Sequence, residues 1–315
     1  MTDPVPLHQA SGSASRELEP VLVLGSTGTT GRRIVAGLRA EGVPVRAATR
    51  SPGKSAEPGL EPVRFDWDDP TSHEDALAGA RAVYVLGPLV STAPEAVLVP
   101  FIDRALALGV RRLVLLSGSP IRLGDPGLGR VHAHLAASGA EWAVLRPTWF
   151  AQNLLDPTHH IGAAVLAGDD LVTATGDGRV GFVDAADIAA VAVRALLDRT
   201  SHDTDHLITG PQALSYDEVA ALLSKSTGHV IRHRAVSAVE AEEHMVDAGM
   251  PRSYAAVLAA MEVDIAAGSE AQLTDTVERV TGRAPTGLGD VLAASLEGRE
   301  LAASATSASP TAVAR

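Results

Sequence analysis

The sequence predicts an α/β protein, in which a doubly wound parallel sheet is followed by a smaller, mainly helical C-terminal region. From residue 20 onward, short apolar runs rich in β-branched residues alternate with longer segments of helical period, a pattern typical of repeated βαβ units. The chain has 315 residues, of which 46% are hydrophobic, and this is enough to enclose a packed core. One sheet-bearing domain with a C-terminal extension therefore fits both the pattern and the length.

Residues 20–155 are expected to carry the sheet. Strands are predicted from apolar and β-branched runs at 21–24, 43–48, 63–65, 82–86, 112–116 and 142–145. Helices between them are predicted from helical periodicity at 30–41, 72–78, 94–108 and 128–138. Gly109 and Gly139 follow the last two helices, at the position where a glycine commonly ends a helix.

Residues 156–300 are expected to complete the fold on the substrate side, because the alternation becomes looser there. Helices are predicted at 184–197, 215–226, 240–248, 252–267 and 274–280, with a short strand at 206–208. Ser215, followed by Glu218, forms the pattern of a capping box. Residues 1–19 and 301–315 are rich in small and polar residues and are expected to be disordered tails.

Composition excludes several classes of function. The formal net charge of −12 argues against nonspecific binding to nucleic acid or to an anionic membrane, because both require an excess of Lys and Arg. The absence of cysteine excludes disulfides, thiolate nucleophiles and Cys-ligated zinc. His159 and His160 lack a third ligand at a convincing spacing, so no metal is predicted.

Compartment and partners follow from the same composition. There is no basic leader and no apolar stretch of about 18 residues, the length that a membrane span requires. A cytoplasmic protein is expected, a monomer or homodimer whose partner is a small molecule. Lys54 and Lys225 are the only lysines, which suggests a GC-rich bacterial genome.

A glycine-rich loop joins the first predicted strand to the first predicted helix. Its residues are Gly25, Ser26, Thr27, Gly28, Thr29, Thr30 and Gly31. A helix N-terminus offers free N–H groups and partial positive charge to a pyrophosphate, and glycines let the backbone approach it closely. A plain tight turn is the alternative, but the order strand, loop, helix is the context in which such a loop binds a dinucleotide. A Rossmann-type domain is therefore predicted for residues 20–155, with every loop residue except Thr29 contacting the cofactor.

The residues after the second strand favour NADPH. An acidic residue there would bind the ribose 2′-hydroxyl of NAD, whereas a basic residue accommodates the 2′-phosphate of NADP. Arg50 ends this segment, Lys54 follows, and no acid occurs before Glu57. Arg50 is the expected phosphate ligand, with Lys54 beside it and Arg32 as a second candidate; the alternative is that Arg50 is an ordinary exposed arginine.

Further cofactor contacts are expected where later strands end. Asp66 follows the third strand, where this fold usually contacts adenine. Gly87 and Pro88 follow the fourth strand and are expected to pass under the ribose. Ser117 and Pro147 end the fifth and sixth strands, where ligands bind in such sheets.

These segments together resemble the NmrA-like group of atypical short-chain dehydrogenases/reductases over residues 20–298. The resemblance is carried by residues 25–31, 50, 65–66, 115–117, 138–142, 145–153, 182–189, 209–211 and 214–216. It implies an NADPH-dependent reductase related to those of azo dyes, triphenylmethane dyes, quinones and ergot alkaloids, or a redox sensor without catalysis.

The chain departs from this superfamily at its catalytic pair. The superfamily uses Tyr-x-x-x-Lys, in which the lysine lowers the pKa of the tyrosine for proton transfer. None of the three tyrosines here is followed by lysine four residues later, and the expected register puts Gly124 and Leu128 at the two positions. Ketone reduction by the tyrosine mechanism is therefore not expected.

Other side chains are expected around the nicotinamide. Ser117 and His132 are the candidate catalytic residues, because Ser117 ends a central strand and a histidine can supply a proton at neutral pH. A packing or solvent-facing role is the alternative for His132. Trp149, Phe150 and Asn153 are expected to line the substrate site, where the aromatic rings would stack on a flat molecule, unless one of the rings belongs to the core.

Three functional hypotheses result. The first is a reductase of a conjugated, electron-poor molecule such as a quinone, an imine or a dye-like aromatic compound, because such an acceptor delocalises the added charge and needs mainly positioning. The second is an NADP(H)-sensing regulatory protein without catalysis. The third is a tailoring enzyme of secondary metabolism that performs coupling or isomerisation without net reduction.

Overall fold

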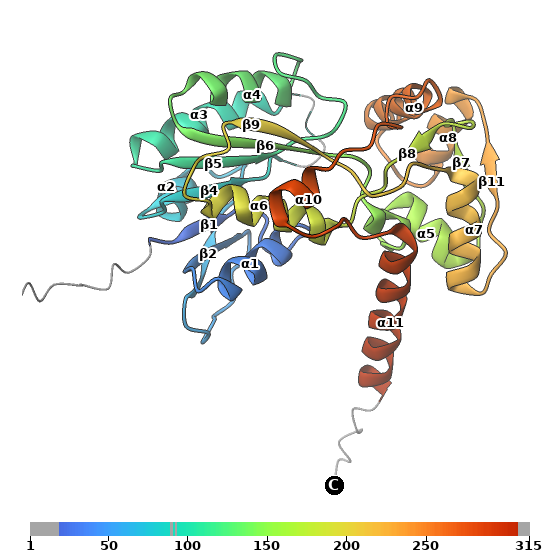
Figure 1. The fold of residues 1–315 in the computed structure, drawn as a ribbon, viewed down its shortest axis with the longest axis horizontal. Coiled ribbons are helices and arrows are strands. Elements are labelled where there is room, and N and C mark those ends of the chain that lie inside the picture. The colour runs from blue at the N-terminus through green and yellow to red at the C-terminus, as the bar shows by residue number, and fades with distance from the viewer. Residues whose placement is uncertain (1–18, 89–90, 92, 308–315) are drawn as a thin grey trace, which may run out of the picture.

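A seven-stranded parallel sheet forms the centre of the protein (Figure 1), and the computed structural model describes residues 19–88, 91 and 93–307. The strands are β1 (Val21–Val23), β2 (Val45–Thr49), β3 (Leu60–Arg64), β4 (Ala82–Val85), β5 (Arg112–Leu116), β6 (Glu141–Pro147) and β9 (Thr204–Ile208). Their order is β3-β2-β1-β4-β5-β6-β9, and neighbouring strands are parallel. The order reverses between β1 and β4, as in a doubly wound sheet, which confirms the predicted fold class.

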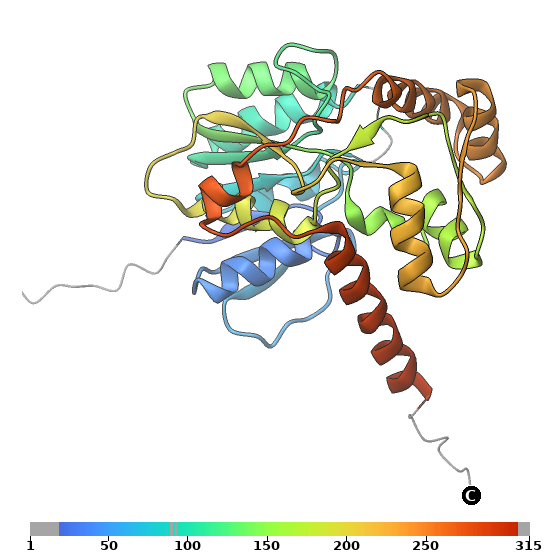
Figure 2. The ribbon, with the colours of Figure 1, turned by 45° about the vertical axis from the view of Figure 1, so that its right-hand side comes forward.

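Helices cover both faces of this sheet (Figures 1 and 2). One face carries α1 (Gly31–Ala40), α6 (Ala185–Leu197) and α10 (Thr276–Thr281), and the other carries α2 (Thr71–Leu77), α3 (Glu95–Ala107) and α4 (Leu128–Ala137). Alternate residues of a strand point to opposite faces. Val21 and Val23 accordingly belong to the core under α1, whereas Leu22 and Leu24 belong to the core under α3.

The C-terminal region lies beside the edge of the sheet at which β5 and β6 end (Figure 1). Its helices are η1 (Ala151–Leu154), α5 (His160–Ala167), α7 (Tyr216–Thr227), α8 (Ala238–Asp247), α9 (Arg252–Ala266) and α11 (Leu288–Ser307). Two small sheets join them, in which β7 (Leu171–Thr173) pairs with β11 (His233–Ala235) and β8 (Arg179–Val180) pairs with β10 (Leu214–Ser215). The region encloses apolar clusters of its own.

The two regions are interleaved along the chain. After η1, α5, β7 and β8, the chain returns to the sheet to form α6 and β9. It returns again, after α9, to form α10. β9 pairs with β6 and becomes the last strand of the sheet. Residues 156–300 therefore supply part of the sheet-bearing domain as well as the C-terminal region.

Most predicted elements are present, with small shifts at their ends. The capping box at Ser215 and Glu218 is formed in full at the start of α7. η1 and the four short strands β7, β8, β10 and β11 were not predicted, because segments of two to four residues show no period. α5 was missed because its sequence after His160 is almost entirely apolar and shows no amphipathic period, and α11 was missed because it begins in a stretch rich in Gly and Pro. α11 continues to Ser307, into the segment expected to be a disordered tail; residues 1–18 and 308–315 lie outside the described residues.

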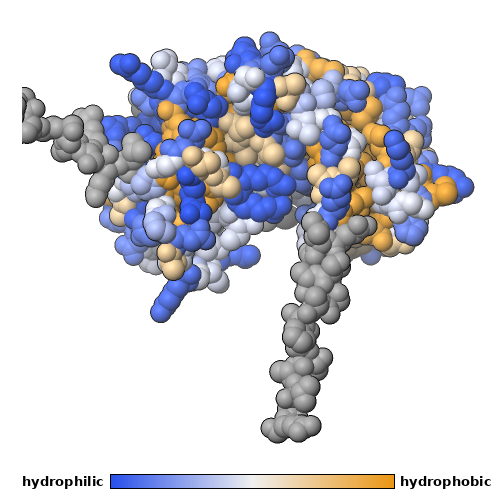
Figure 3. Space-filling view, turned by 60° about the horizontal axis from the view of Figure 1, so that its bottom comes forward, coloured by the Kyte–Doolittle hydropathy of each residue, from blue (hydrophilic) through white to orange (hydrophobic). Residues whose placement is uncertain are grey.

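The surface is mixed in character. Hydrophilic and apolar side chains are interspersed on the face shown in Figure 3, and no single apolar patch covers that face. Within the described ranges, no helix combines the length and the apolar character needed to cross a bilayer.

Candidate functional site

The glycine-rich loop turns between β1 and α1 in a way that requires glycine. Gly25 has φ +63°, and a Cβ on Gly31 would lie 2.1 Å from the carbonyl oxygen of Gly25. The Gly28 amide donates to this same oxygen at 2.9 Å. Ser26 fixes the loop to β2, because its amide and its hydroxyl both donate to the carbonyl of Ala48, at 3.1 and 2.9 Å.

The loop leaves several backbone donors free. The amides of Thr27, Thr29 and Thr30 donate no hydrogen bond to any part of the chain that the structure describes. These N–H groups precede α1, at the end of the helix where the partial charge is positive. These donors suit a pyrophosphate group, and the cofactor contacts of the loop residues stay predictions.

Thr30 differs from the other loop residues because its side chain points into the core. Its hydroxyl makes a 2.9 Å hydrogen bond with the hydroxyl of Tyr84 on β4, and both residues are buried. Burial raises the pKa of Tyr84 well above its ordinary value. Only the backbone of Thr30 is thus available to a ligand, and Tyr84 has a structural role.

The basic residues predicted to hold the 2′-phosphate lie beside the loop. Arg50 directly follows β2, which pairs with β1, and both Arg50 and Lys54 are exposed. Neither side chain has a hydrogen bond or an ion pair among the residues that the structure covers. Arg32, the second candidate, lies exposed in the first turn of α1.

Asp66 lies at the expected edge, but part of its carboxylate is already used. One carboxylate oxygen of Asp66 accepts from the amide of Asp68 at 3.1 Å. The backbone carbonyl of Asp66 accepts from the Ser72 hydroxyl and lies 2.8 Å from Nε2 of His73. These bonds stabilise the start of α2. Contact between Asp66 and adenine stays a prediction. Gly87 and Pro88 follow β4 and are half-buried.

Ser117 directly follows β5, and Pro147 is the last residue of β6. The amide of Ser117 donates to the carbonyl of Leu145 at 2.7 Å, and the amide of Ser119 donates to the carbonyl of Pro147 at 2.9 Å. Ser117 is half-buried, and Pro147 is buried. Both residues thus lie at the carboxyl edge, where the glycine-rich loop also lies.

A buried serine–glutamate pair, which the sequence analysis missed, lies at this same edge. The Ser119 hydroxyl donates to Oε2 of Glu270 at 2.6 Å, and the two residues are 9% and 4% exposed. Burial raises the pKa of Glu270, although the bond from Ser119 and the charge of Arg146 oppose this shift. The Glu270 carboxyl group therefore holds its proton to a higher pH than an exposed glutamate does.

A cavity of about 270 Å³ borders this pair. It is lined by residues that follow β5, by residues of β6 and β9, and by the segment after α9, including Ser119, Arg122, Arg146, Thr148, Leu207 and Glu270. The guanidinium of Arg146 donates to the carbonyl of Ser119 and to Asp205. The cavity thus brings the Glu270 carboxyl group and the Arg146 guanidinium to one wall, and Asp264 also lines it.

His132 does not reach this cavity wall. It lies on α4, is 3% exposed and packs against Trp142, the second residue of β6, with ring centroids 5.3 Å apart. Burial lowers its pKa, and its Nε2 has no hydrogen-bond partner among the described residues. This position favours the packing role, so proton donation by His132 stays a prediction that the geometry does not support.

The three residues predicted to line the substrate site follow β6 closely. Trp149 and Phe150 are half-buried, and they pack against different apolar clusters, Trp149 in the C-terminal region and Phe150 on the α1 side of the sheet. Asn153 is half-buried in η1. The segment is fixed by Gln152, whose side chain bonds to Asp184 and to the amide of Ala185.

Comparison with known proteins agrees with this geometry. A family model described as NAD(P)H-binding matches residues 25–199, from the first glycine of the loop to just beyond α6. YesF, an uncharacterized oxidoreductase of Bacillus subtilis (strain 168), is 38% identical over 275 residues, which are 87% of this chain and 94% of that protein. Festuclavine synthase I of Penicillium roqueforti (strain FM164) is 38% identical over 276 residues, 84% of this chain and 94% of that protein.

A solved structure shows the same fold. The NADPH-dependent quinone oxidoreductase of Escherichia coli, complexed with NADPH, has a TM-score of 0.74 at 24% identity and covers 88% of this chain and 99% of its own. The resemblance inferred from the loop and its neighbours is confirmed by these matches. Because the family model spans more than half of the chain and YesF matches 87% of it, the protein belongs to the NAD(P)H-binding oxidoreductase family.

Proposed function

We propose that the protein is an NADPH-dependent reductase that reduces a conjugated small molecule such as a quinone, an imine or a dye-like aromatic compound. The observation that supports catalysis is the buried pair of Ser119 and Glu270 beside the cavity at the carboxyl edge. NADPH, when bound, supplies a hydride. The chain must then bind the cofactor, orient the acceptor and provide a proton.

The glycine-rich loop and the residues after β2 would hold the cofactor. The free amides of Thr27, Thr29 and Thr30 suit the pyrophosphate, and the unpaired charges of Arg50 and Lys54 suit a 2′-phosphate. No acidic side chain precedes Glu57 in this segment to favour the 2′-hydroxyl of NADH instead.

The class of acceptor rests on two arguments. An acceptor that spreads the added charge over a conjugated system needs no strongly activated acid, which suits a chain without the Tyr-x-x-x-Lys pair. One protein of the same fold is named as a quinone oxidoreductase, and a quinone is a conjugated acceptor of this kind.

Ser119 and Glu270 would supply the proton. As the acceptor gains a hydride, Ser119 gives its hydroxyl proton to the heteroatom of the acceptor and takes one from the Glu270 carboxyl group. Water then restores the proton to Glu270. Burial raises the pKa of Glu270 above its ordinary value, which favours the protonated carboxyl group that this proton transfer requires.

Steady-state oxidation of NADPH with menadione tests the proposal. Glu270→Gln should lower kcat by at least about tenfold, because general acid catalysis commonly contributes a factor of about 10² or more, and it should remove the loss of rate at high pH. Glu278→Gln is the matched control, since Glu278 is exposed on α10. If a panel of quinones, imines and azo dyes is inert, and NADP⁺ and NADPH bind with markedly different affinities, a regulatory function replaces the reductase.

A further inference from the structure

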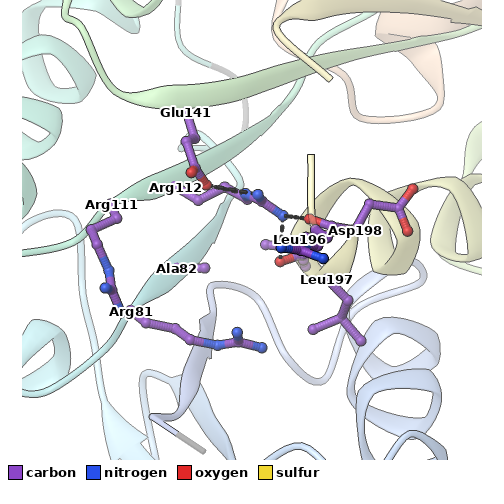
Figure 4. Close-up of a pocket in the computed structure, with 9 residues that line it drawn as sticks. Arg81, Ala82, Arg111, Arg112, Glu141, Leu196, Leu197 and Asp198 are labelled. Carbon is purple, nitrogen blue, oxygen red and sulfur yellow. Dashed lines mark hydrogen bonds and ion pairs between the residues drawn. The ribbon is translucent and has the colours of Figure 1, made fainter. Parts of the chain in front are cut away.

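A second cavity lies at the opposite, amino edge of the sheet (Figure 4). Its volume is about 200 Å³. Its wall includes residues at the starts of β4, β5 and β6 and at the end of α6; the charged ones are Arg81, Arg111, Arg112, Glu141, Asp198 and Arg199. Four arginines thus face two acids in a protein whose net charge is −12.

Arg112 is the buried arginine of this set, and its guanidinium donors already have acceptors within the protein. Its side chain is 9% exposed. Nε donates to Glu141 at 2.7 Å, and Nη1 donates to the carbonyl of Asp198 at 2.6 Å and to that of Leu196 at 3.2 Å. Figure 4 shows these bonds as dashed lines. Arg112 therefore stabilises the C-terminal end of α6, and Glu141 balances its charge.

Arg81, which is half-buried, and Arg199, which is exposed, have no such partner. Neither side chain makes a hydrogen bond or an ion pair within the described ranges, and Nε of Arg81 is buried without an acceptor. No dashed line reaches Arg81 or Arg111 in Figure 4, although Arg111 pairs with Glu19 at the surface, outside the lining. Burial lowers the pKa of Arg81, the charges of Arg112 and Arg111 also lower it, and the charge of Glu19 raises it. Two nearby positive charges thus oppose the charge of this guanidinium, and one nearby negative charge supports it.

We propose that this cavity is a binding site for a phosphate group, either inorganic phosphate or the phosphate of a phosphomonoester. A planar guanidinium presents paired N–H donors that match phosphate oxygens, and the two arginines without partners can balance a dianion. The cavity volume of about 200 Å³ equals that of several water molecules, because one molecule occupies about 30 Å³ in liquid water. This volume suits a compact anion. Arg81 and Arg199 are the expected ligands, and the site is separate from the one proposed for NADPH.

Calorimetric titration of the NADPH-saturated protein with inorganic phosphate at low salt tests this site. Saturating NADPH occupies the loop and Arg50, so phosphate bound there does not contribute. Arg81→Gln and Arg199→Gln should each weaken phosphate binding by about tenfold, the effect of losing one charge-assisted contact. Arg232→Gln is the control, because Arg232 is an exposed arginine next to β11, and it should bind like the wild type.

Acetate and glycerol 3-phosphate complete the test. Acetate, a monoanion, should bind far more weakly than phosphate. Tighter binding of glycerol 3-phosphate would identify a phosphomonoester as the ligand, and tighter binding of inorganic phosphate would identify the free ion. Equal phosphate affinity in the wild type and Arg81→Gln, or acetate binding as tight as phosphate binding, would overturn the proposal. These calorimetric binding measurements do not depend on reductase activity.

Discussion

Substitution of Gly31 by alanine tests the geometry of the cofactor loop most directly. A Cβ at this position would lie 2.1 Å from the carbonyl oxygen of Gly25 and 2.7 Å from its carbonyl carbon, whereas nonbonded heavy atoms are in optimal contact at about 3.5–4.0 Å. Both atoms belong to the backbone, so no side-chain rotation relieves the clash. The loop must move away from α1 by about 1 Å or more.

This movement should reduce affinity for NADPH rather than unfold the protein. The free amides of the loop would lose their alignment toward the pyrophosphate, and each hydrogen bond to a charged group contributes about 1.5–3 kcal/mol. A loss of about 3 kcal/mol, from one or two such bonds, weakens binding by about two orders of magnitude.

Calorimetric titration with NADPH measures this loss, and circular dichroism checks that each variant is folded. Gly298→Ala is the matched control, because Gly298 lies within α11 and a Cβ there would have no heavy atom within 4 Å. That variant should bind NADPH like the wild type. A folded Gly31→Ala protein with unchanged affinity for NADPH would refute the assignment of the loop.

Three further predictions concern the cofactor, the core and the pH dependence of stability. Arg50→Gln should weaken NADPH binding by about tenfold through loss of a charge-assisted contact and leave NADH binding unchanged; an equal loss for both nucleotides in calorimetry would remove Arg50 as the 2′-phosphate ligand. Tyr84→Phe leaves the buried Thr30 hydroxyl without its partner, so the free energy of unfolding in urea should fall by about 1–2 kcal/mol, and an unchanged value would contradict the structural role of this bond. Burial lowers the pKa of His206 from 6.5 to about 4. Between pH 6.5 and pH 4 the unfolded chain therefore binds a proton at His206 that the folded chain does not bind. The free energy of unfolding should fall by up to about 1.4 kcal/mol for each pH unit as the pH drops through this range. Urea unfolding at pH 7 and pH 5 measures this change, and His206→Asn should reduce it; the same pH dependence in both proteins would point to other groups.

The sheet and the cofactor loop were predictable because their signals are local. The strand, loop and helix around Gly25 and Gly31 occupy one continuous segment, and the close approach of these two residues follows from a turn of seven residues. The same holds for the capping box at Ser215, whose two members are three residues apart.

The substrate side was less predictable because its contacts join distant segments. Ser119 and Glu270 are 151 residues apart, and no pattern around Glu270 indicates that it is buried. His132 is different, because a usable signal was present. It lies four residues after Leu128 and three before Leu135, on the apolar stripe of α4 that also includes Val131, and such a stripe faces the core.

The return of the chain to the sheet limits how this protein can be divided. A truncated chain ending at residue 155 would lack α6 and β9, leaving β6 as an unpaired edge strand and the core around Val21 and Val23 uncovered on one side. Exposed edges and apolar faces of this kind promote aggregation. Exchange of substrate regions among relatives would therefore require several junctions, on either side of α6–β9 and around α10, rather than a single cut. New substrates are reached more simply by changing the segments between these elements while the sheet stays whole.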